Sequence, residues 1–267
     1  MGADLSVLRA LNEQDRRHDA QRPLENRSDF ISPYLALPGL VGYWPVSSID
    51  RSSSQIVDLS GQDRVLSQNG NPLKNYTAGG APYITLDGGG DLVSRASEAD
   101  LQVTATESDY HSSIRGLTIG CWVRPDSIAA LAGIWGKYAA TGNQRSYLLF
   151  LQAGGAGALR FLVSGDGTAT TTVDPVATVT AGNWYHVVGR LKPSVSLDIC
   201  LSGVWASNTT SIPASIYAST AALQGGAFES ANLLTGGLAQ MFICACYLSD
   251  GIIGRLFRRT RPFFYGA

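Results

Sequence analysis

The sequence is poor in charge and has almost no lysine. Charged residues make up 15% of the 267 residues, the net charge is −1, and only Lys74, Lys137 and Lys192 accompany the arginines. A nearly neutral chain has no global electrostatic preference for nucleic acid or for an anionic membrane, so we expect neither as a partner. The predominance of arginine favours use at protein interfaces, because a guanidinium group holds a carboxylate through two parallel hydrogen bonds.

Long hydrophobic runs and cysteine motifs are also missing. No run approaches the roughly 18 apolar residues that a membrane helix needs, and charged residues interrupt the first 20 positions where a secretory signal would stand. There is no C-x-x-C motif among the four cysteines, which are Cys121, Cys200, Cys244 and Cys246. We therefore expect buried free thiols in a protein made in a reducing compartment, without a signal peptide.

Catalytic and metal-binding patterns are absent as well. Glycoside hydrolases need paired carboxylates, and alternating acids on one strand would supply them. The nearest pairs, Glu98 with Asp100 and Glu107 with Asp109, lie in polar, loop-like surroundings. The three histidines are His18, His111 and His186. None of them has a cysteine or a second histidine at the spacing that metal ligands need. We expect no catalytic residues and no zinc site, and His186 reads as a structural strand residue.

The first 38 residues differ from the rest of the chain. Leucines at helical spacing predict a short helix that ends near Arg17, with Asp4 or Ser6 as its cap. The polar residues 18–32 cannot form a core of their own, so residues 1–38 form either a solvated tail or an arm that orders against a partner. We favour the arm because it carries apolar anchors, which are Leu5, Leu8, Leu11, Phe30 and Tyr34.

From Gly39 onward the sequence is typical of short strands joined by tight turns. Glycine is abundant at 30 residues, and apolar residues still reach 45%. Leu117–Val123 alternates between two faces, whereas Leu238–Leu248 is apolar on both faces and is therefore predicted to be a central, covered strand. Trp184–Leu191 and Ser196–Leu201 are predicted to form a hairpin.

The C-terminal end combines a predicted helix with a basic and aromatic tail. Ser249 is expected to cap a short helix whose apolar stripe contains Ile252, Ile253, Leu256 and Phe257. The remaining basic and aromatic residues of this end are Arg255, Arg258, Arg259, Arg261, Phe263 and Phe264. Because the whole chain is almost neutral, we interpret them as a docking patch for an acidic protein surface rather than for nucleic acid.

Several stretches, taken in order, resemble one family. They are Gly39-Leu-Val-Gly-Tyr-Trp-Pro45, Asp58-Leu-Ser-Gly61, Thr85-Leu-Asp-Gly-Gly-Gly-Asp-Leu-Val93, Leu117-Thr-Ile-Gly-Cys-Trp-Val-Arg-Pro125, Gly182-Asn-Trp-Tyr-His-Val-Val188 and the strand with its helix from Gly236 to Asp250. Together they resemble the laminin-G-like jelly rolls of the concanavalin A type, of the kind found in phage structural proteins. The resemblance implies an all-β, two-sheet antiparallel sandwich over residues 39–267, with a short N-terminal arm and a short C-terminal helix.

The resemblance also makes calcium a possible ligand. Asp58, Asp87 and Asp91 fall in turns where such ligands could gather. The closing strand, however, carries Ala239 where related domains often have an acid. Asp in tight turns is also explained by backbone hydrogen bonding alone, and we favour that interpretation, with no metal or other cofactor.

Sugar binding, which the resemblance also suggests, needs an exposed aromatic platform. The available aromatic residues are Trp135, Tyr138, Tyr147, Trp205 and Tyr217. Aromatic side chains in sandwiches belong to the core more often than to a platform. The sequence alone does not say which of these are exposed.

Three function classes therefore remain: a virion protein, a carbohydrate-binding module or adhesin, and a hydrolase with an unrecognised site. We favour a non-enzymatic phage virion protein, such as a capsid decoration or head/tail accessory protein. It would be made in the host cytoplasm and would dock onto other virion proteins through its two ends, as a homo-oligomer. A glycan partner, for instance on a phage fibre, is the alternative.

Overall fold

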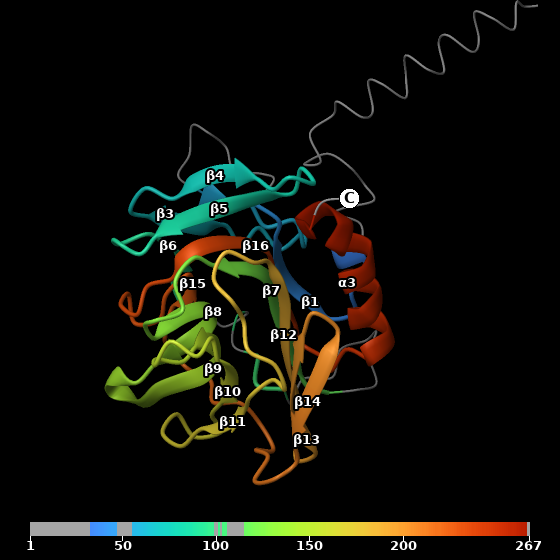
Figure 1. The fold of residues 1–267 in the computed structure, drawn as a ribbon. Helices are drawn as coiled ribbons and strands as arrows, with labels where there is room; N and C mark the ends of the chain where they lie inside the picture. Colours follow the sequence, from blue (N-terminus) through green and yellow to red (C-terminus); the bar gives the residue numbers. More distant parts are fainter. Residues whose placement is uncertain (1–32, 47–54, 99–100, 102, 106–114, 266–267) are drawn as a thin grey trace, which may run out of the picture.

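The protein is a sandwich of two eight-stranded antiparallel sheets with one long helix against the outer face of the first sheet (Figure 1). This computed structural model describes residues 33–46, 55–98, 101, 103–105 and 115–265. The predicted all-β, concanavalin A-like sandwich with a C-terminal helix is confirmed. The boundary of the arm at residue 38 stays a prediction.

The first sheet has the order β14-β13-β12-β7-β16-β5-β4, and β1 also pairs with β16. Its strands are β1 (Leu40–Trp44), β4 (Leu73–Tyr76), β5 (Pro82–Asp87), β7 (Leu117–Pro125), β12 (Tyr185–Lys192), β13 (Ser196–Leu201), β14 (Val204–Asn208) and β16 (Thr235–Cys244). The predicted hairpin is confirmed by the pairing of β12 with β13.

The second sheet has the order β11-β10-β9-β8-β15-β6-β3-β2. Its strands are β2 (Gln55–Ile56), β3 (Leu66–Asn69), β6 (Leu92–Arg95), β8 (Ala132–Ala139), β9 (Gln144–Leu151), β10 (Leu159–Val163), β11 (Thr171–Val173) and β15 (Leu223–Gly225). A short 3-10 helix, η3 (Thr141–Asn143), joins β8 to β9.

The main core lies between the two sheets and follows from strand alternation. In β7, Leu117, Ile119, Cys121 and Val123 all point into this core, as their spacing predicts. The other face of β7 is not exposed to solvent, because Thr118 and Trp122 are also fully buried. A second apolar layer therefore covers the outer face of the first sheet.

The closing strand β16 is covered on both faces and contains a β-bulge. The register shifts between Ala239 and Phe242, and Gln240 at the bulge has a left-handed φ of 52°. The extra residue lets Leu238 and Met241 face the same inter-sheet core although they are three positions apart. The predicted central position of this strand is confirmed, but the strand ends at Cys244 rather than at Leu248.

The predicted short helix with a separate tail is wrong in its length. Helix α3 runs from Asp250 to Tyr265, so Arg261, Phe263 and Phe264 belong to the helix. Pro262 lies within it, although proline lacks the N–H that an interior position normally donates. The reason is tertiary, because the last turn buries Phe264 against the first sheet.

Candidate docking surface

The C-terminal half of α3 is fixed to the first sheet by aromatic stacking. The ring of Phe264 lies parallel to that of Trp122 on β7, with 4.2 Å between centroids. Trp184 packs edge-on against Phe264 at 5.0 Å. The indole N–H of Trp122 also donates to the hydroxyl of Thr260 over 3.0 Å, so the buried nitrogen has a partner. This half of the helix is therefore held in one position.

The N-terminal end of α3 is fixed by Arg190 on β12. Its guanidinium group lies 3.7 Å from the ring centroid of Trp205 and 4.3 Å from that of Tyr247. It contacts Asp198 at 3.2 Å and Asp250, in the first turn of α3, at 2.6 Å. An acidic residue in the first turn also suits the helix dipole. Arg190 thus joins the sheet to the start of the helix.

The described end of the N-terminal segment packs beside α3. Tyr34 is fully buried, and its ring stacks on Tyr43 of β1 with 4.7 Å between centroids. Leu37 belongs to the same apolar cluster, together with Leu256 of α3. Residues 33–38 therefore form part of the second apolar layer.

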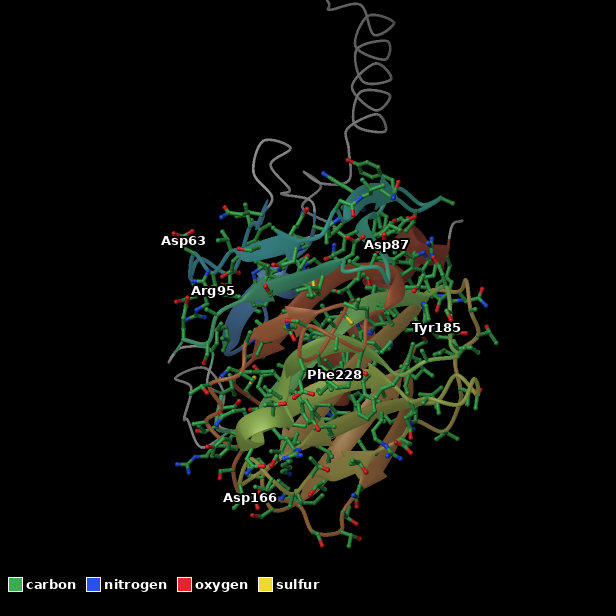
Figure 2. All side chains as sticks on the ribbon, turned by 90° about the vertical axis from the view of Figure 1, so that its left-hand side faces the viewer. Asp63, Asp87, Arg95, Asp166, Tyr185 and Phe228 are labelled. Atoms are coloured by element: carbon green, nitrogen blue, oxygen red, sulfur yellow. The ribbon has the colours of Figure 1, made fainter. Side chains whose placement is uncertain are left out.

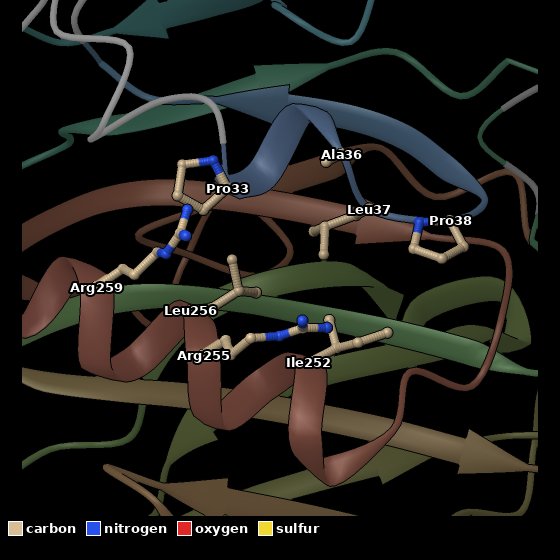
Figure 3. A pocket seen from close by; sticks show the side chains of 8 residues that line it. All are labelled: Pro33, Ala36, Leu37, Pro38, Ile252, Arg255, Leu256 and Arg259. Carbon is tan, nitrogen blue, oxygen red and sulfur yellow. The ribbon is translucent and has the colours of Figure 1, made fainter.

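A groove of about 400 Å³ lies between residues 33–38 and α3. Leu37 and Leu256 extend into it from its two sides, and Arg259 reaches toward Pro33 (Figure 3). Its lining consists of Pro33, Ala36, Leu37, Pro38, Ile252, Arg255, Leu256 and Arg259. The groove thus combines apolar walls with two guanidinium groups.

The arginines of α3 form two pairs on two flanks of the helix. Arg255 and Arg259 line the groove, whereas Arg258 and Arg261 do not. All four are exposed, and within the described part of the chain none of them forms an ion pair. Arg261 instead lies over the rings of Phe257 and Tyr265 at 6.0 and 5.6 Å. Four positive charges are therefore presented on a helix whose position is fixed.

The predicted partner-binding residues are only partly brought together. Arg255, Arg258, Arg259 and Arg261 share one helix, and Phe263 beside them is half-buried. Tyr34 and Phe264 are buried inside the protein itself, because each stacks on an aromatic residue of the first sheet, and so neither is exposed to a partner. Leu5, Leu8, Leu11 and Phe30 lie outside the described residues. Partner binding by any of these residues stays a prediction.

Two buried titratable groups lie away from the groove. His186 on β12 is fully buried between Trp122 and Phe257, and burial lowers its pKa to about 3, so the ring is neutral. Lys137 on β8 is also inaccessible, and its ammonium donates to the hydroxyl of Ser97 at 2.8 Å and to the carbonyl of Ser219. Burial lowers the pKa of Lys137 to about 8. The sequence shows that Lys137 lies in an apolar strand, but it gives no indication of the contacts that this lysine makes.

The three aspartates considered for calcium organise turns instead. Asp58 accepts main-chain N–H bonds from Tyr43, Ser60 and Arg64 over 2.9, 2.8 and 3.2 Å. Asp91 accepts from the N–H groups of Asn71 and Asp87, and Asp87 accepts from that of Gly89. These are the backbone contacts for which turns use Asp.

The described ranges contain neither a metal-binding cluster nor a membrane-spanning helix. No three His, Cys, Asp or Glu side chains there lie close enough to hold a metal ion. All four cysteines are buried thiols that form no disulfide, as expected. Glu98 pairs with Arg95 at 2.6 Å, whereas Asp100, Glu107 and Asp109 lie outside the described residues. No helix within those ranges has the length and apolar character to span a bilayer.

The aromatic residues considered for sugar binding divide into two groups. Trp135 and Tyr147 are fully buried in the core, so neither offers a platform. Tyr138 is half-buried, on the outer face of the second sheet, where it packs edge-on against Phe228 at 5.5 Å. Phe228 lies near the middle of the face seen in Figure 2. Trp205 and Tyr217 are also half-buried, and Trp205 covers Arg190.

The two antiparallel sheets and their topology define a lectin-like jelly roll. The family model described as the concanavalin A-like lectin/glucanases superfamily matches residues 95–253, and the chain belongs to this superfamily. This confirms the family resemblance that the ordered sequence stretches indicate.

Solved structures with a similar fold include receptor-binding domains of toxins. The receptor binding domain of botulinum neurotoxin C/D mosaic serotype has a TM-score of 0.62 and 11% identity, with 82% of this chain and 51% of that chain covered. A structure of botulinum neurotoxin type C, whose cell entry is dependent upon interaction with two ganglioside molecules, has a TM-score of 0.62 and 13% identity, covering 83% and 51%.

A third similar structure is the binding domain of Paraclostridial Mosquitocidal Protein 1, with a TM-score of 0.61 and 14% identity, covering 82% of this chain and 52% of that chain. This chain therefore spans about half the length of the solved structures that it matches. At such low identity the likeness shows the fold alone. A comparison with curated protein sequences gives no match.

Proposed function

We propose that this protein is a non-catalytic, lectin-like module that docks onto a larger protein assembly through the arginines of α3. The observation that carries the proposal is a set of four exposed arginines without ion pairs in the described structure, on a helix fixed at both ends. Because the backbone of the helix is already immobile, docking has to order only the side chains of these arginines. An acidic protein surface is the complementary partner.

The assembly that we propose is a bacteriophage virion, in which the protein serves as a capsid decoration or head/tail accessory protein. Support comes from the sequence stretches that carry the resemblance, from four buried cysteines that form no disulfide and from the position of residues 33–38 next to α3. In this proposal the protein is made in the host cytoplasm and is oligomeric on the particle.

Sedimentation of intact particles tests this proposal. The wild-type protein should sediment with particles in a fixed stoichiometry, and Arg258→Glu/Arg261→Glu should lose at least about tenfold in affinity, equivalent to about 1.4 kcal/mol. The matched control is Arg115→Glu/Lys192→Glu, which reverses two other exposed charges and should bind normally. Equal binding of the two double variants would contradict docking through α3.

Glycan binding is the second candidate, and the interaction of botulinum neurotoxin type C with two ganglioside molecules favours it. The half-buried Tyr138 and Phe150 beside Phe228 offer an aromatic surface on the second sheet. A glycan panel should then show saturable binding that Tyr138→Ala abolishes and Tyr76→Ala, an exposed aromatic on β4, leaves intact. Trp135→Ala is unsuited to this test because it would open a cavity in the core.

A further inference from the structure

The groove beside α3 has the chemistry of a receptor for an amphipathic helix. Leu37, Ile252 and Leu256 give it apolar walls, and Arg255 and Arg259 stand one helical turn apart along it (Figure 3). A volume of about 400 Å³ is too small for a whole helix but fits apolar side chains from one helix face. Helix-in-groove recognition uses such anchors at spacings of three and four residues.

A segment with the matching pattern is attached at the edge of this groove. Pro33 lines the groove, and 32 residues precede it in the chain. Leu5, Leu8 and Leu11 recur at helical spacing in that segment. Asp4 and Asp15 fall in register with Leu8 and Leu11 on a helix, at steps of four, three and four residues. On a helix docked by its leucines, the carboxylates of Asp4 and Asp15 would therefore face Arg255 and Arg259. These two arginines form no ion pair in the described structure.

The chain between the leucine-bearing segment and the groove is long enough for the segment to dock within its own molecule. At roughly 3.3–3.6 Å per residue, residues 18–32 extend to about 50 Å, which exceeds what a return to the groove requires. A tethered segment of this kind has an effective concentration of about the millimolar range at a site that it can reach. A second copy of the chain competes only when its own concentration approaches that value.

We infer that the leucine-bearing segment around residues 4–15 docks in the groove of its own chain, with its carboxylates toward Arg255 and Arg259. The groove flank of α3 is then covered in the free protein, while Arg258 and Arg261 on the other flank stay open. Occupation of the groove does not depend on the proposed function.

Cysteine cross-linking of the full-length protein tests the inference. Asn12→Cys combined with Ala36→Cys, treated with a short bismaleimide, should give an intramolecular link in the monomer, identified by peptide mass. Ala36 is exposed and lines the groove. The control pair, Asn12→Cys with Ala153→Cys, places the second thiol in the exposed turn between β9 and β10 and should link at least about tenfold more slowly, as expected for a tenfold lower effective concentration. The native cysteines are buried and provide a low background.

Charge and apolar variants add a second criterion. Leu8→Asp/Leu11→Asp and Arg255→Glu/Arg259→Glu should each slow the Asn12–Ala36 link by about tenfold or more, equivalent to about 1.4 kcal/mol. Arg258→Glu/Arg261→Glu carries the same charge change on the other flank and should leave the rate unchanged. A link no faster than the Ala153 control overturns the inference. A link found only between two chains also overturns it and identifies a second copy as the occupant.

The two proposals fail in different experiments. Undiminished particle binding by Arg258→Glu/Arg261→Glu would refute the proposed function and would not involve the cross-link. Normal particle binding without the intramolecular link would refute the docked segment and leave the proposed function in place.

Discussion

Trp122 and Phe264 lie face to face, 4.2 Å apart and with only 7° between their ring planes, although they are far apart in the sequence. The first belongs to β7, a central strand of the first sheet, and the second to the last turn of α3. This contact attaches the end of the helix to the sandwich and keeps α3 helical past Pro262. The stack determines which face of α3, with its arginines, is turned toward solvent.

Truncation of this contact should loosen the helix. Phe264→Ala is expected to lower the free energy of unfolding by about 3–5 kcal/mol, because it removes a buried ring and leaves a cavity. Tyr265→Ala changes the next aromatic residue, which is 46% exposed, and should cost less than about 1 kcal/mol. Urea unfolding followed by tryptophan fluorescence measures both. Equal losses in the two variants would show that the stack does not hold the helix.

Removal of Arg190 should be more damaging than removal of its exposed partner. Arg190→Leu leaves the buried carboxylate of Asp198 without its guanidinium partner and should cost about 3–5 kcal/mol in unfolding free energy. Asp250→Asn should cost at most about 1 kcal/mol, since Asp250 is mostly exposed. The double variant Arg190→Leu/Asp198→Leu should recover part of the loss, which equilibrium unfolding would detect. A double variant no more stable than Arg190→Leu would argue against an unpaired charge as the cause.

His186 should make stability fall as the solution becomes acidic. Its pKa is lowered to about 3 in the fold, whereas an exposed histidine titrates near 6.5, so the unfolded chain binds the proton first. The free energy of unfolding should therefore decrease between pH 6.5 and pH 3, by up to about 1.4 kcal/mol per pH unit. His186→Leu should lack this contribution. The informative quantity is the difference between wild type and variant at each pH, since carboxylates titrate in both, and a constant difference would contradict the prediction.

Deletion of Gln240 should remove the bulge in β16 without exchanging the faces of the strand. Without this residue, Leu238, Ala239, Met241 and Phe242 alternate regularly, so Met241 still points into the inter-sheet core and Phe242 out of it. The deletion removes the bonds of Gln240 to Tyr43 and Pro45, so the variant should fold with a lower free energy of unfolding. Gln240→Gly loses the same bonds, keeps the extra residue and tolerates the φ of 52°, and it is the matched control. Circular dichroism and urea unfolding of the purified variants measure the outcome, and a deletion variant that does not fold would contradict the prediction.

Much of the sandwich could be predicted from local patterns. Alternation in Leu117–Val123 identified the core face of β7, and the spacing of Trp184–Leu191 and Ser196–Leu201 identified a hairpin. The core face and the hairpin both depend on residues that are close together in the sequence, along one strand or across one turn. The local pattern therefore predicts them directly. The two apolar faces of Leu238–Leu248 likewise indicated a covered strand, but not the bulge, because a bulge leaves the composition of a strand unchanged.

The candidate site could be predicted only in part. The arginines at residues 255–261 were visible as a cluster, yet their division between a groove and an open flank depends on residues 33–38. Tyr34 and Phe264 were predicted to bind a partner and are buried within the protein itself, since exposed and buried aromatic residues look alike in a sequence. Trp135 was considered for sugar binding for the same reason.

By itself the sequence determined a lectin-like sandwich with four buried cysteines and a helix that begins after Ser249, because these features follow from periodicity, composition and turn residues within short stretches. Only the tertiary structure decided how far that helix extends, which arginines line a groove and that His186 stays neutral. Each of these depends on contacts between distant segments, such as Trp122 with Phe264 and Leu37 with Leu256, and burial through such contacts outweighs the local preference of a proline or the usual pKa of a histidine.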